Sequence, residues 1–257
     1  MSKQIYTGSE MAVSAAARRV EDNKVYFVGV GLPMMATALA QRLHAPHITV
    51  IFEGGSVQPV SSTKYMPFSP NDARSCFRAV MLSSTTDVLS LMQRGHVDYG
   101  FISGAQIDQY GNVNTSFIGD FRKPKTRLPG SGGANDIASF GKVMILTKHE
   151  RRRFVEKVDF ITSPGNVDEK GRESHGLIFG KPFEIFTNLA EMEYDPKDRR
   201  VALKALHPGV KLQDVLENTG FKPNVPSRLD ETHPPTDEEL EFLRKMDPEG
   251  RWVAHPQ

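Results

Sequence analysis

The stretch KVYFVGVGLPMMATALAQRLHAPHITVIFEGG, residues 24–55, decides the fold. Its first part, KVYFVGVG (24–31), is an apolar run that breaks at glycines, and it predicts a buried strand. The segment MMATALAQRL (34–43) predicts a helix, and Pro33 suits the first turn of that helix. HITVIFE (47–53) is a second apolar, β-branched run that ends just before two glycines. Strand, helix and strand within about thirty residues predict a βαβ unit and a parallel sheet.

Later segments repeat this pattern. A predicted helix near 86–94 leads into VDYGFIS (97–103), which stops at Gly104, and KVMILT (142–147) predicts a further strand. Several strands therefore end on glycines or polar residues at what would be one edge of the sheet. In open α/β sheets the carboxyl edge is where ligands bind. We expect an α/β fold built on an open, mostly parallel sheet with helices on both faces.

The two ends of the chain differ in character. Residues 9–22 are rich in alanine with apolar positions at helical spacing, and Ser9 with the following glutamate suits a helix start. Prolines recur in the last third, where DEELEFLRKMD (237–247) is the last predicted helix. We expect a single domain over 1–257 in which 205–257 is an extension that packs on the domain or on a partner. A disordered tail is the alternative.

The composition excludes several classes of protein. The formal net charge is +1, which gives no reason to expect nucleic acid as a partner. No window reaches 18 consecutive apolar residues, and the polar N-terminus lacks the apolar core of a signal peptide. Cys76 is the only cysteine, so neither an internal disulfide nor a thiolate metal site is expected. These features predict a soluble, cytoplasmic protein without a metal site.

The first candidate site is the segment GVGLPM, residues 29–34. A dinucleotide-binding fingerprint needs a third glycine for close helix packing, and Met34 stands at that position. Glu53 lies about twenty residues later, where the ribose-binding acid of such a unit would be. An NAD-binding unit therefore stays open as an alternative, although the missing glycine counts against it.

Glu53 is itself the second candidate. A carboxylate at the end of an apolar strand is expected to be partly desolvated, which would raise its basicity and nucleophilicity. Gly54 and Gly55 remove side chains beside it, so a bulky acyl group could approach. The alternative is a glutamate that caps a turn or forms an ion pair.

The third candidate is SGAQIDQYGNVNTSFIGDFRKPKTRLPGSGGANDIA, residues 103–138. Its glycines and asparagines predict tight turns. The part GSGGAN (130–135) could expose several backbone N–H groups ahead of a helix that starts near Asn135 and Asp136. Such groups can hold an anion or a developing oxyanion. A purely structural glycine loop is the alternative.

Taken together, the chain resembles the family I CoA-transferases, most closely the β subunit of glutaconate CoA-transferase. The segments that carry the resemblance run in the same order over most of the chain: GVGLP (29–33), EGG (53–55), AQIDQYGNVNTSFIGDFRKPKTRLPGSGGAND (105–136), HERRRFVEKVDFITSPG (149–165) and VLENTGF (215–221). The resemblance implies the α/β fold of this family, also called NagB-like. It also implies a separately encoded, homologous α subunit as a partner, in a heterodimer or a higher αβ oligomer.

The resemblance also implies a mechanism. In the family a glutamate of an E-x-G motif attacks an acyl-CoA thioester, and CoA is held as a glutamyl-CoA thioester before a second acid takes it. That glutamate corresponds to Glu53, and the backbone amide that stabilises the oxyanion corresponds to Gly133, with Gly132 as the next choice. CoA is then a substrate, with no tightly bound cofactor. The residues expected to contact CoA are Gly29, Gly31, Gly55, Gly104, Gln106, Ala134 and Asn135.

Some departures bear on the substrate. Gly54 stands where the glutaconate enzymes carry serine, and the following segment SVQPVSSTKYMPFSP (56–70), expected to form part of the acyl pocket, is less similar. We therefore expect a dicarboxylic or oxo acid other than glutaconate. Relatives of this fold that act as ring-opening acyl-CoA hydrolases or as decarboxylases lack the strand-terminal glutamate. Hydrolysis or decarboxylation stays the main alternative, and a non-catalytic nucleotide-binding subunit is the third.

Overall fold

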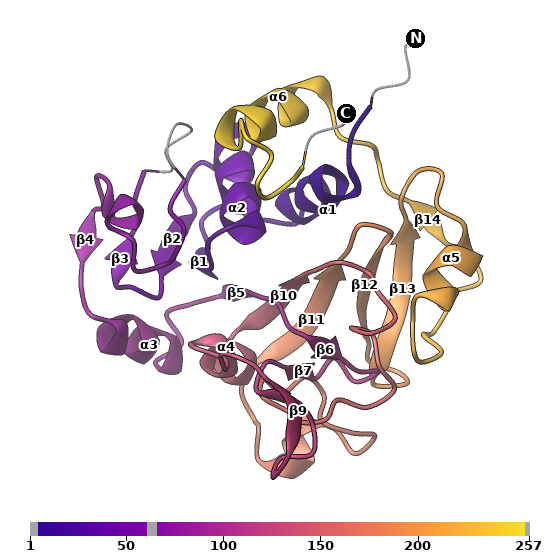
Figure 1. Cartoon of the computed structure of the whole chain (residues 1–257). Helices are drawn as coiled ribbons and strands as arrows, with labels where there is room; N and C mark the ends of the chain where they lie inside the picture. Colours follow the sequence, from indigo (N-terminus) through magenta and orange to yellow (C-terminus); the bar gives the residue numbers. More distant parts are fainter. Residues whose placement is uncertain (1–4, 61–65, 255–257) are drawn as a thin grey trace. The chain divides into compact units, whose positions relative to one another are not determined.

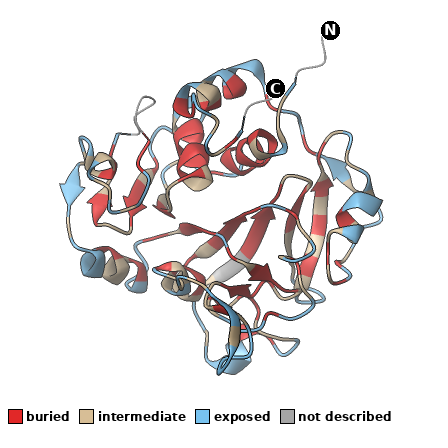
Figure 2. Cartoon of the chain, in the orientation of Figure 1, coloured by how far each residue is buried: buried red, intermediate tan, exposed pale blue. Residues whose placement is uncertain are grey.

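The computed structural model describes residues 5–60 and 66–254, and the chain folds into two compact units (Figure 1). The first unit combines residues up to Asp98 with residues from His233 onward, and the second comprises Tyr99–Thr232. Each unit has its own strands and helices, and buried residues lie along them in both units (Figure 2), most of them apolar. The predicted α/β class is confirmed.

The sheet of the first unit contains the predicted βαβ motif. Strands β1 (Val25–Val28) and β2 (Thr49–Phe52) pair in parallel, with Val28 opposite Phe52. Two short antiparallel strands follow, β3 (Ser56–Val57) and β4 (Met81–Leu82), which give the order β1-β2-β3-β4. Parallel pairing of β1 and β2 brings their carboxyl ends together, as the sequence predicted.

The described part of the first unit also contains the helical segments α1 (Gly8–Ala17), α2 (Leu32–Leu43), the 3-10 helix η1 (Ala73–Cys76), α3 (Thr85–Gln93) and α6 (Asp237–Met246). The expected start of α1 at Ser9 is wrong, because Thr7 caps the helix. The Thr7 hydroxyl accepts the N–H of Glu10 at 3.1 Å, and the Glu10 carboxylate accepts the N–H of Thr7 at 2.8 Å. This reciprocal capping box fixes the helix start.

The C-terminal helix α6 packs against α1 and α2. Two ion pairs join α6 to α1: Arg18 with Glu239, and Arg244 with the fully buried Glu10 at 2.8 Å. The described part of 205–257 is therefore structured up to residue 254, with its last helix where the sequence predicted one. No helix among the described residues is long and apolar enough to span a membrane.

The sheet of the second unit has the order β14-β13-β12-β11-β10-β5. Its strands are β5 (Tyr99–Ile102), β10 (Lys142–Leu146), β11 (Lys181–Phe186), β12 (Ala190–Asp195), β13 (Arg200–Leu206) and β14 (Asp230–Glu231). The pairs β5–β10, β10–β11 and β13–β14 are parallel, whereas β11–β12 and β12–β13 are antiparallel. The parallel core was predicted, and the antiparallel meander was not.

Smaller elements lie between these strands. They are the two hairpins β6 (Gln106–Ile107) with β7 (Val113–Asn114) and β8 (Phe117–Gly119) with β9 (Pro124–Arg127), and the helical segments α4 (Ala134–Phe140), η2 (Arg172–His175) and α5 (Leu212–Glu217). Helix α4 begins where the sequence predicted a helix near Asn135, and Gly133 is its N-cap.

Candidate active site

Glu53 lies in a tight turn at the carboxyl end of β2. The Gly55 N–H donates to the Phe52 carbonyl oxygen at 3.0 Å, so Glu53 and Gly54 are the two central residues of the turn. Strand β3 then returns antiparallel to β2, with Val57 opposite Ile51. The Glu53 side chain is half-buried in the isolated chain. A carboxylate is thus presented at the sheet edge where ligands bind in α/β proteins.

The two glycines after Glu53 allow other backbone segments of the chain to pack closely against the turn. A Cβ atom on Gly54 would lie 2.4 Å from the Pro70 carbonyl oxygen, and one on Gly55 would lie 2.0 Å from the Ser83 carbonyl oxygen. Gly55 also has a φ of +98°, which side chains other than glycine rarely adopt. The interpretation that these glycines leave room for an acyl group is therefore wrong, because other segments of the chain fill that room. A contact between Gly55 and CoA stays a prediction.

The loop after β1 runs beside the Glu53 turn, because the two strands are parallel and in register at their last residues. Gly31 is the N-cap of α2 and has a φ of +97°. A Cβ atom there would lie 3.0 Å from the indole ring of Trp252, whereas one on Gly29 would meet no atom within 4 Å. Gly29, Gly31, Glu53 and Gly55 are thus brought to one edge of the first unit.

The predicted residues Gly104 and Gln106 belong to the second unit. Gly104 follows the end of β5, and its carbonyl oxygen accepts a hydrogen bond from Arg153 Nη1 at 2.8 Å. The Gln106 amide is engaged at both ends: its nitrogen donates to Asp159 Oδ2 at 3.0 Å, and its oxygen accepts from Asn114 Nδ2 at 2.7 Å. These bonds favour a structural role for Gln106, and its contact with CoA stays a prediction.

The hairpin that follows Gln106 is held by a further buried carboxylate. Asp108 accepts hydrogen bonds from the backbone N–H groups of Tyr110 and Asn112 at 3.0 and 3.1 Å, and from the Asn112 side chain at 3.1 Å. Burial raises the pKa of the Asp108 carboxyl, although these hydrogen bonds act in the opposite direction. The motif IDQYGNVN (107–114) is therefore a scaffold whose polar side chains satisfy one another.

The glycine loop ahead of α4 is the candidate oxyanion site. The Gly130 N–H donates to the Thr115 carbonyl oxygen at 2.9 Å, and the Ala134 N–H donates to the Ser131 carbonyl oxygen at 3.0 Å. Gly132 has a φ of +51°, and Gly133 is buried at the start of the helix. The Ala134 amide is thus engaged within this turn, and the roles of Gly132 and Gly133 as donors to a ligand stay predictions.

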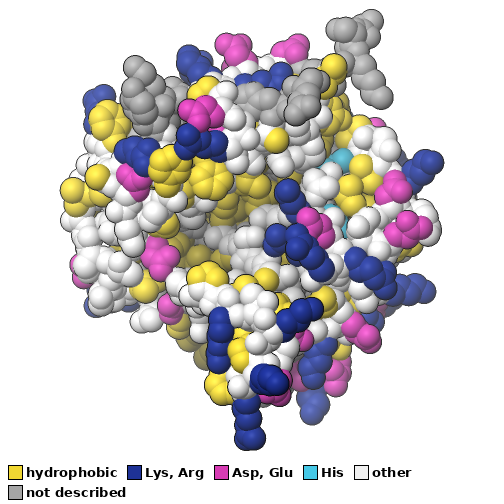
Figure 3. Space-filling model, viewed as in Figure 1, with side chains coloured by type: hydrophobic (Ala, Val, Ile, Leu, Met, Phe, Trp, Pro, Cys, Tyr) yellow, Lys and Arg dark blue, Asp and Glu magenta, His cyan; other side chains and the backbone are white. Residues whose placement is uncertain are grey.

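Basic side chains precede this loop. The exposed residues Arg122, Lys123, Lys125 and Arg127 lie on or beside β9, and Figure 3 shows Lys and Arg side chains gathered where Figure 1 draws this strand. Asn135, a further expected contact of CoA, is exposed in the first turn of α4, and its Oδ1 accepts a hydrogen bond from Ser139. A strand of this charge suits a substrate that carries phosphate groups.

The candidate residues thus form two groups. Glu53, Gly29, Gly31 and Gly55 share the first unit, and Gly104, Gln106, Gly132, Gly133, Ala134 and Asn135 share the second. The pairing of Glu53 with the amide of Gly133 stays a prediction. Within the described ranges, no three His, Cys, Asp or Glu side chains are grouped as they would be to hold a metal ion.

Comparisons with known proteins show the family to which the chain belongs. The family model described as Coenzyme A transferase matches residues 9–218. The B subunit of 3-oxoadipate CoA-transferase from Pseudomonas knackmussii is 39% identical over 245 residues, which is 94% of each chain. The B subunit of glutaconate CoA-transferase from Acidaminococcus fermentans is 36% identical over 259 residues, covering 98% of this chain and 96% of that relative.

Solved structures agree with these sequence matches. A chain of the crystal structure of glutaconate coenzyme A-transferase from A. fermentans superposes with a TM-score of 0.88 at 34% identity, covering 98% of both chains. A chain of the decarboxylase AibA/AibB superposes with a TM-score of 0.83 at 27% identity, covering 98% of this chain and 99% of that one. The chain therefore belongs to the coenzyme A transferase family and is an α/β CoA-transferase subunit. Within that family it is a family I β subunit, similar to the B subunit of glutaconate CoA-transferase.

Proposed function

We propose that this chain is the catalytic β subunit of a heteromeric enzyme that moves CoA from an acyl-CoA thioester to a carboxylic acid through a glutamyl-CoA thioester on Glu53. The observation that carries the proposal is the position of Glu53, a carboxylate in a tight turn at the carboxyl end of a parallel strand. The relatives named above, which keep high coverage of the chain, support the same activity.

The proposed chemistry needs no change in the number of bound protons. A Glu53 carboxylate oxygen attacks the thioester carbonyl carbon, the carbon–sulfur bond breaks, and CoA thiolate leaves an acyl-glutamyl anhydride. The thiolate then attacks the glutamyl carbonyl carbon of the anhydride. The bond from that carbon to the bridging oxygen breaks, the first acid leaves as a carboxylate, and CoA remains on Glu53. A second carboxylate takes the CoA by the same steps in reverse.

Each addition step places negative charge on a carbonyl oxygen, so the site needs hydrogen-bond donors aimed at that oxygen. The backbone N–H of Gly133 is our first choice and that of Gly132 our second, since both belong to the glycine loop ahead of α4. Removing one such donor typically costs ~10²–10³-fold in rate. Water must be excluded during both covalent stages, because it would hydrolyse the anhydride or the thioester.

The proposed partner is a homologous α subunit. The names of two relatives, each of which denotes the B subunit of its enzyme, support a heteromeric enzyme. The acids in those names, 3-oxoadipate and glutaconate, are dicarboxylic. We therefore propose a dicarboxylic or oxo acid as acceptor, with CoA bound as substrate at the strand ends and glycine loops described above.

The decisive experiment detects the intermediate. The co-expressed αβ complex is treated with acyl-CoA in the absence of an acceptor acid, reduced with borohydride, digested and analysed by mass spectrometry. Reduction of a glutamyl thioester to the alcohol lowers the mass of the peptide that contains Glu53 by about 14 Da, the mark of a covalent intermediate on this carboxylate. The Glu53→Gln variant is the control and should show no change.

The same variant tests the rate. Loss of the nucleophile in Glu53→Gln or Glu53→Ala should lower CoA exchange by at least about 10³-fold, while assembly with the α subunit and the unfolding transition stay as in the wild type. Near-normal exchange by both variants would contradict the proposed role of Glu53.

Hydrolysis or decarboxylation is the second candidate. The similarity to the AibA/AibB decarboxylase favours it, as does 29% identity over 154 residues with a chain named cholesterol ring-cleaving hydrolase IpdB subunit from Mycobacterium tuberculosis. Consumption of a donor acyl-CoA without any acceptor acid, and without modification of Glu53, would support this alternative over transfer.

A further inference from the structure

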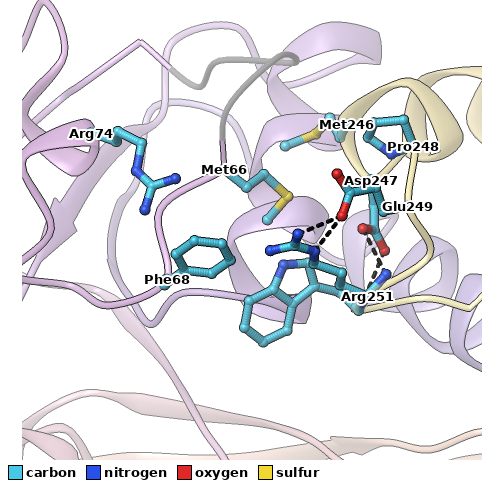
Figure 4. Close-up of a pocket in the computed structure, with 9 residues that line it drawn as sticks. Met66, Phe68, Arg74, Met246, Asp247, Pro248, Glu249 and Arg251 are labelled. Carbon is cyan, nitrogen blue, oxygen red and sulfur yellow. Dashed lines mark hydrogen bonds and ion pairs between the residues drawn. The ribbon is translucent and has the colours of Figure 1, made fainter.

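A cavity of about 170 Å³ lies wholly within the first unit. Two segments distant in the sequence line it, and Figure 4 shows them on opposite sides. One side carries Phe68 and Arg74, the other carries Met246, Asp247, Pro248, Glu249 and Arg251, and Met66 lies between these two sides. Trp252 also lines the cavity. The sequence contained no motif that pointed to this cavity, because its two sides are separated by most of the chain.

One lining residue of the cavity, Trp252, contacts the candidate active site directly, and the other side of the cavity leads along the chain to residues that do so. Trp252 packs on Gly31, where its ring lies 3.0 Å from the position a Cβ atom would take. Pro70 and Asn71, which follow Phe68 closely in the chain, pack on Gly54 beside Glu53, at 2.4 and 2.7 Å from the equivalent position. A ligand in the cavity therefore lies against Trp252, which contacts Gly31 in the loop after β1, and against Phe68, which precedes in the chain the residues that pack on Gly54.

The lining combines apolar surface with two guanidinium groups. The ring of Phe68 is exposed, and the guanidinium carbons of Arg74 and Arg251 lie 4.5 and 5.1 Å from its centre. Stacking on an aromatic ring holds a guanidinium in a fixed plane, with donors left at its edge. Met66, Met246, Pro248 and Trp252 supply the apolar part of the wall.

The acidic residues of the cavity are already engaged. Asp247 is buried and accepts hydrogen bonds from the backbone N–H groups of Arg251, Trp252 and Val253 at 2.9, 2.7 and 3.0 Å. Glu249 accepts a bond from Arg251 Nε at 2.7 Å, and Asp72 pairs with Arg74. Glu249 and Asp72 thus orient the two guanidinium groups, whose remaining N–H donors match a further carboxylate.

The size of the cavity indicates whether it could hold the acid or the nucleotide part of an acyl-CoA substrate. Pockets for drug-sized ligands measure ~300–1,000 Å³, so this cavity suits a short acid and not a nucleotide. We propose that it binds the acyl chain of a dicarboxylic acid, with the chain on Phe68 and Trp252 and the distal carboxylate at Arg74 and Arg251. This inference rests on the proposed function, since the near carboxylate must reach Glu53.

The test compares two six-carbon acids that differ only in the distal carboxylate, adipate and hexanoate, as acceptors for the co-expressed αβ complex. Arg251→Leu and Arg74→Leu should each lower the ratio of kcat/KM for adipate to that for hexanoate by at least about 10-fold. Arg251→Lys should give a ratio between that of the leucine variants and that of the wild type. Arg42→Leu is the matched control, because Arg42 is exposed in the last turn of α2, away from the N-terminal end at Gly31. It should keep the wild-type ratio.

Binding is measured separately from turnover. Trp252 is the only tryptophan of this chain, so addition of adipate to the complex should change the fluorescence, and the change should be absent in Trp252→Phe. A wild-type complex with neither a preference for adipate nor this change overturns the inference. So does an unchanged acceptor ratio in both leucine variants, or dissociation of their complexes, which would assign the cavity to subunit contact.

Failure of this inference is distinct from failure of the proposed function. The borohydride-reducible adduct on Glu53 forms without any acceptor acid, and it should form in Arg74→Leu and Arg251→Leu with an acyl-CoA that lacks a distal carboxylate. An adduct in the wild type together with an unchanged acceptor ratio removes only the assignment of the cavity. Absence of the adduct from the wild type removes the proposed function.

Discussion

Four glycines around Glu53 serve different physical purposes. Gly31 and Gly55 adopt φ angles near +100°, where a side chain is strained. Gly54 has no such angle, but Pro70 packs on its Cα so closely that a side chain does not fit. At Gly29 neither reason applies, since the space beside it is open and its φ is not positive. Gly29 is therefore the one of the four whose conformation and packing leave the choice of glycine unexplained.

Alanine substitutions at Gly55 and Gly29 should separate folding from binding. Gly55→Ala combines an unfavourable φ with a clash against the Ser83 backbone, so we expect a loss of about 2–4 kcal/mol in the free energy of unfolding. Gly29→Ala should stay within about 0.5 kcal/mol of the wild type. If Gly29 contacts CoA, the same variant should raise KM for acyl-CoA. Chemical denaturation and steady-state kinetics measure the two effects, and equal stability of the two variants would contradict the packing argument.

At the scale of elements, the sequence predicted those features that local patterns encode. Apolar runs marked β1, β2, β5 and β10, because strands covered on both faces are continuously apolar. Strand β13 was missed, although its residues alternate between buried and half-exposed positions in a period of two. Its partner β12 contains three acidic residues, and the burial of Glu191 depends on a hydrogen bond from Thr232, far along the chain. Contacts between residues so far apart in the chain leave no local sequence pattern.

A pair of buried histidines in the second unit predicts acid sensitivity. His149 stacks on Phe154 with ring centres 4.3 Å apart, and its ring nitrogens lie 3.1 and 2.9 Å from the hydroxyl oxygens of Thr187 and Thr219. Burial lowers the pKa of His149 to about 4, and the nearby His207 contributes to the same shift. Burial also lowers the pKa of His207 to about 4. Both imidazoles are therefore neutral in the folded state.

The sign of the pH effect follows from these values. In the unfolded chain His149 and His207 take up protons near pH 6.5, whereas in the folded chain they stay neutral down to about pH 4. Stability should be independent of the two groups above pH 6.5, fall as the pH drops from 6.5 to 4, and level off below. At pH 5 the loss is about 2 kcal/mol per histidine. The free energy of unfolding against pH measures it, and a His149→Gln, His207→Gln variant with the wild-type slope would contradict this assignment.

The contact between α6 and α1 makes a second prediction at this scale. Glu10 is fully buried and accepts bonds from Arg244, whose side chain is 35% exposed. Arg244→Leu leaves a buried carboxylate without this partner, and we expect a loss of about 2 kcal/mol in the free energy of unfolding, less than for a fully enclosed pair. The double variant Glu10→Gln, Arg244→Leu should recover part of the loss. Thermal unfolding measures both, and an additive double variant would contradict the ion pair's role.

At the scale of the whole molecule, sequence patterns reach their limit. The family motifs predicted site roles for Glu53 and for the glycine loop of 130–133, because each is a short contiguous segment with a defined turn. The cavity lined by Trp252 left no such signal, since its lining residues come from two segments far apart in the sequence. The expected C-terminal extension thus contributes to the candidate site, although its residues had suggested only a packing role.

The exposure of Glu53 and of the strand β4 predicts that the chain alone is inactive. Glu53 is only half-buried in the isolated chain, and an anhydride at such a position is open to water. Among the described strands, β4 ends the sheet order, and Val80, Met81 and Leu82 on and beside it are exposed, which is typical of a surface that another chain covers. We expect no measurable CoA exchange from the purified chain and recovery of exchange on addition of its α subunit, with an αβ complex seen by native mass spectrometry. Full exchange by a monomer of this chain would contradict the requirement for a second subunit and would place the whole reaction within this one chain.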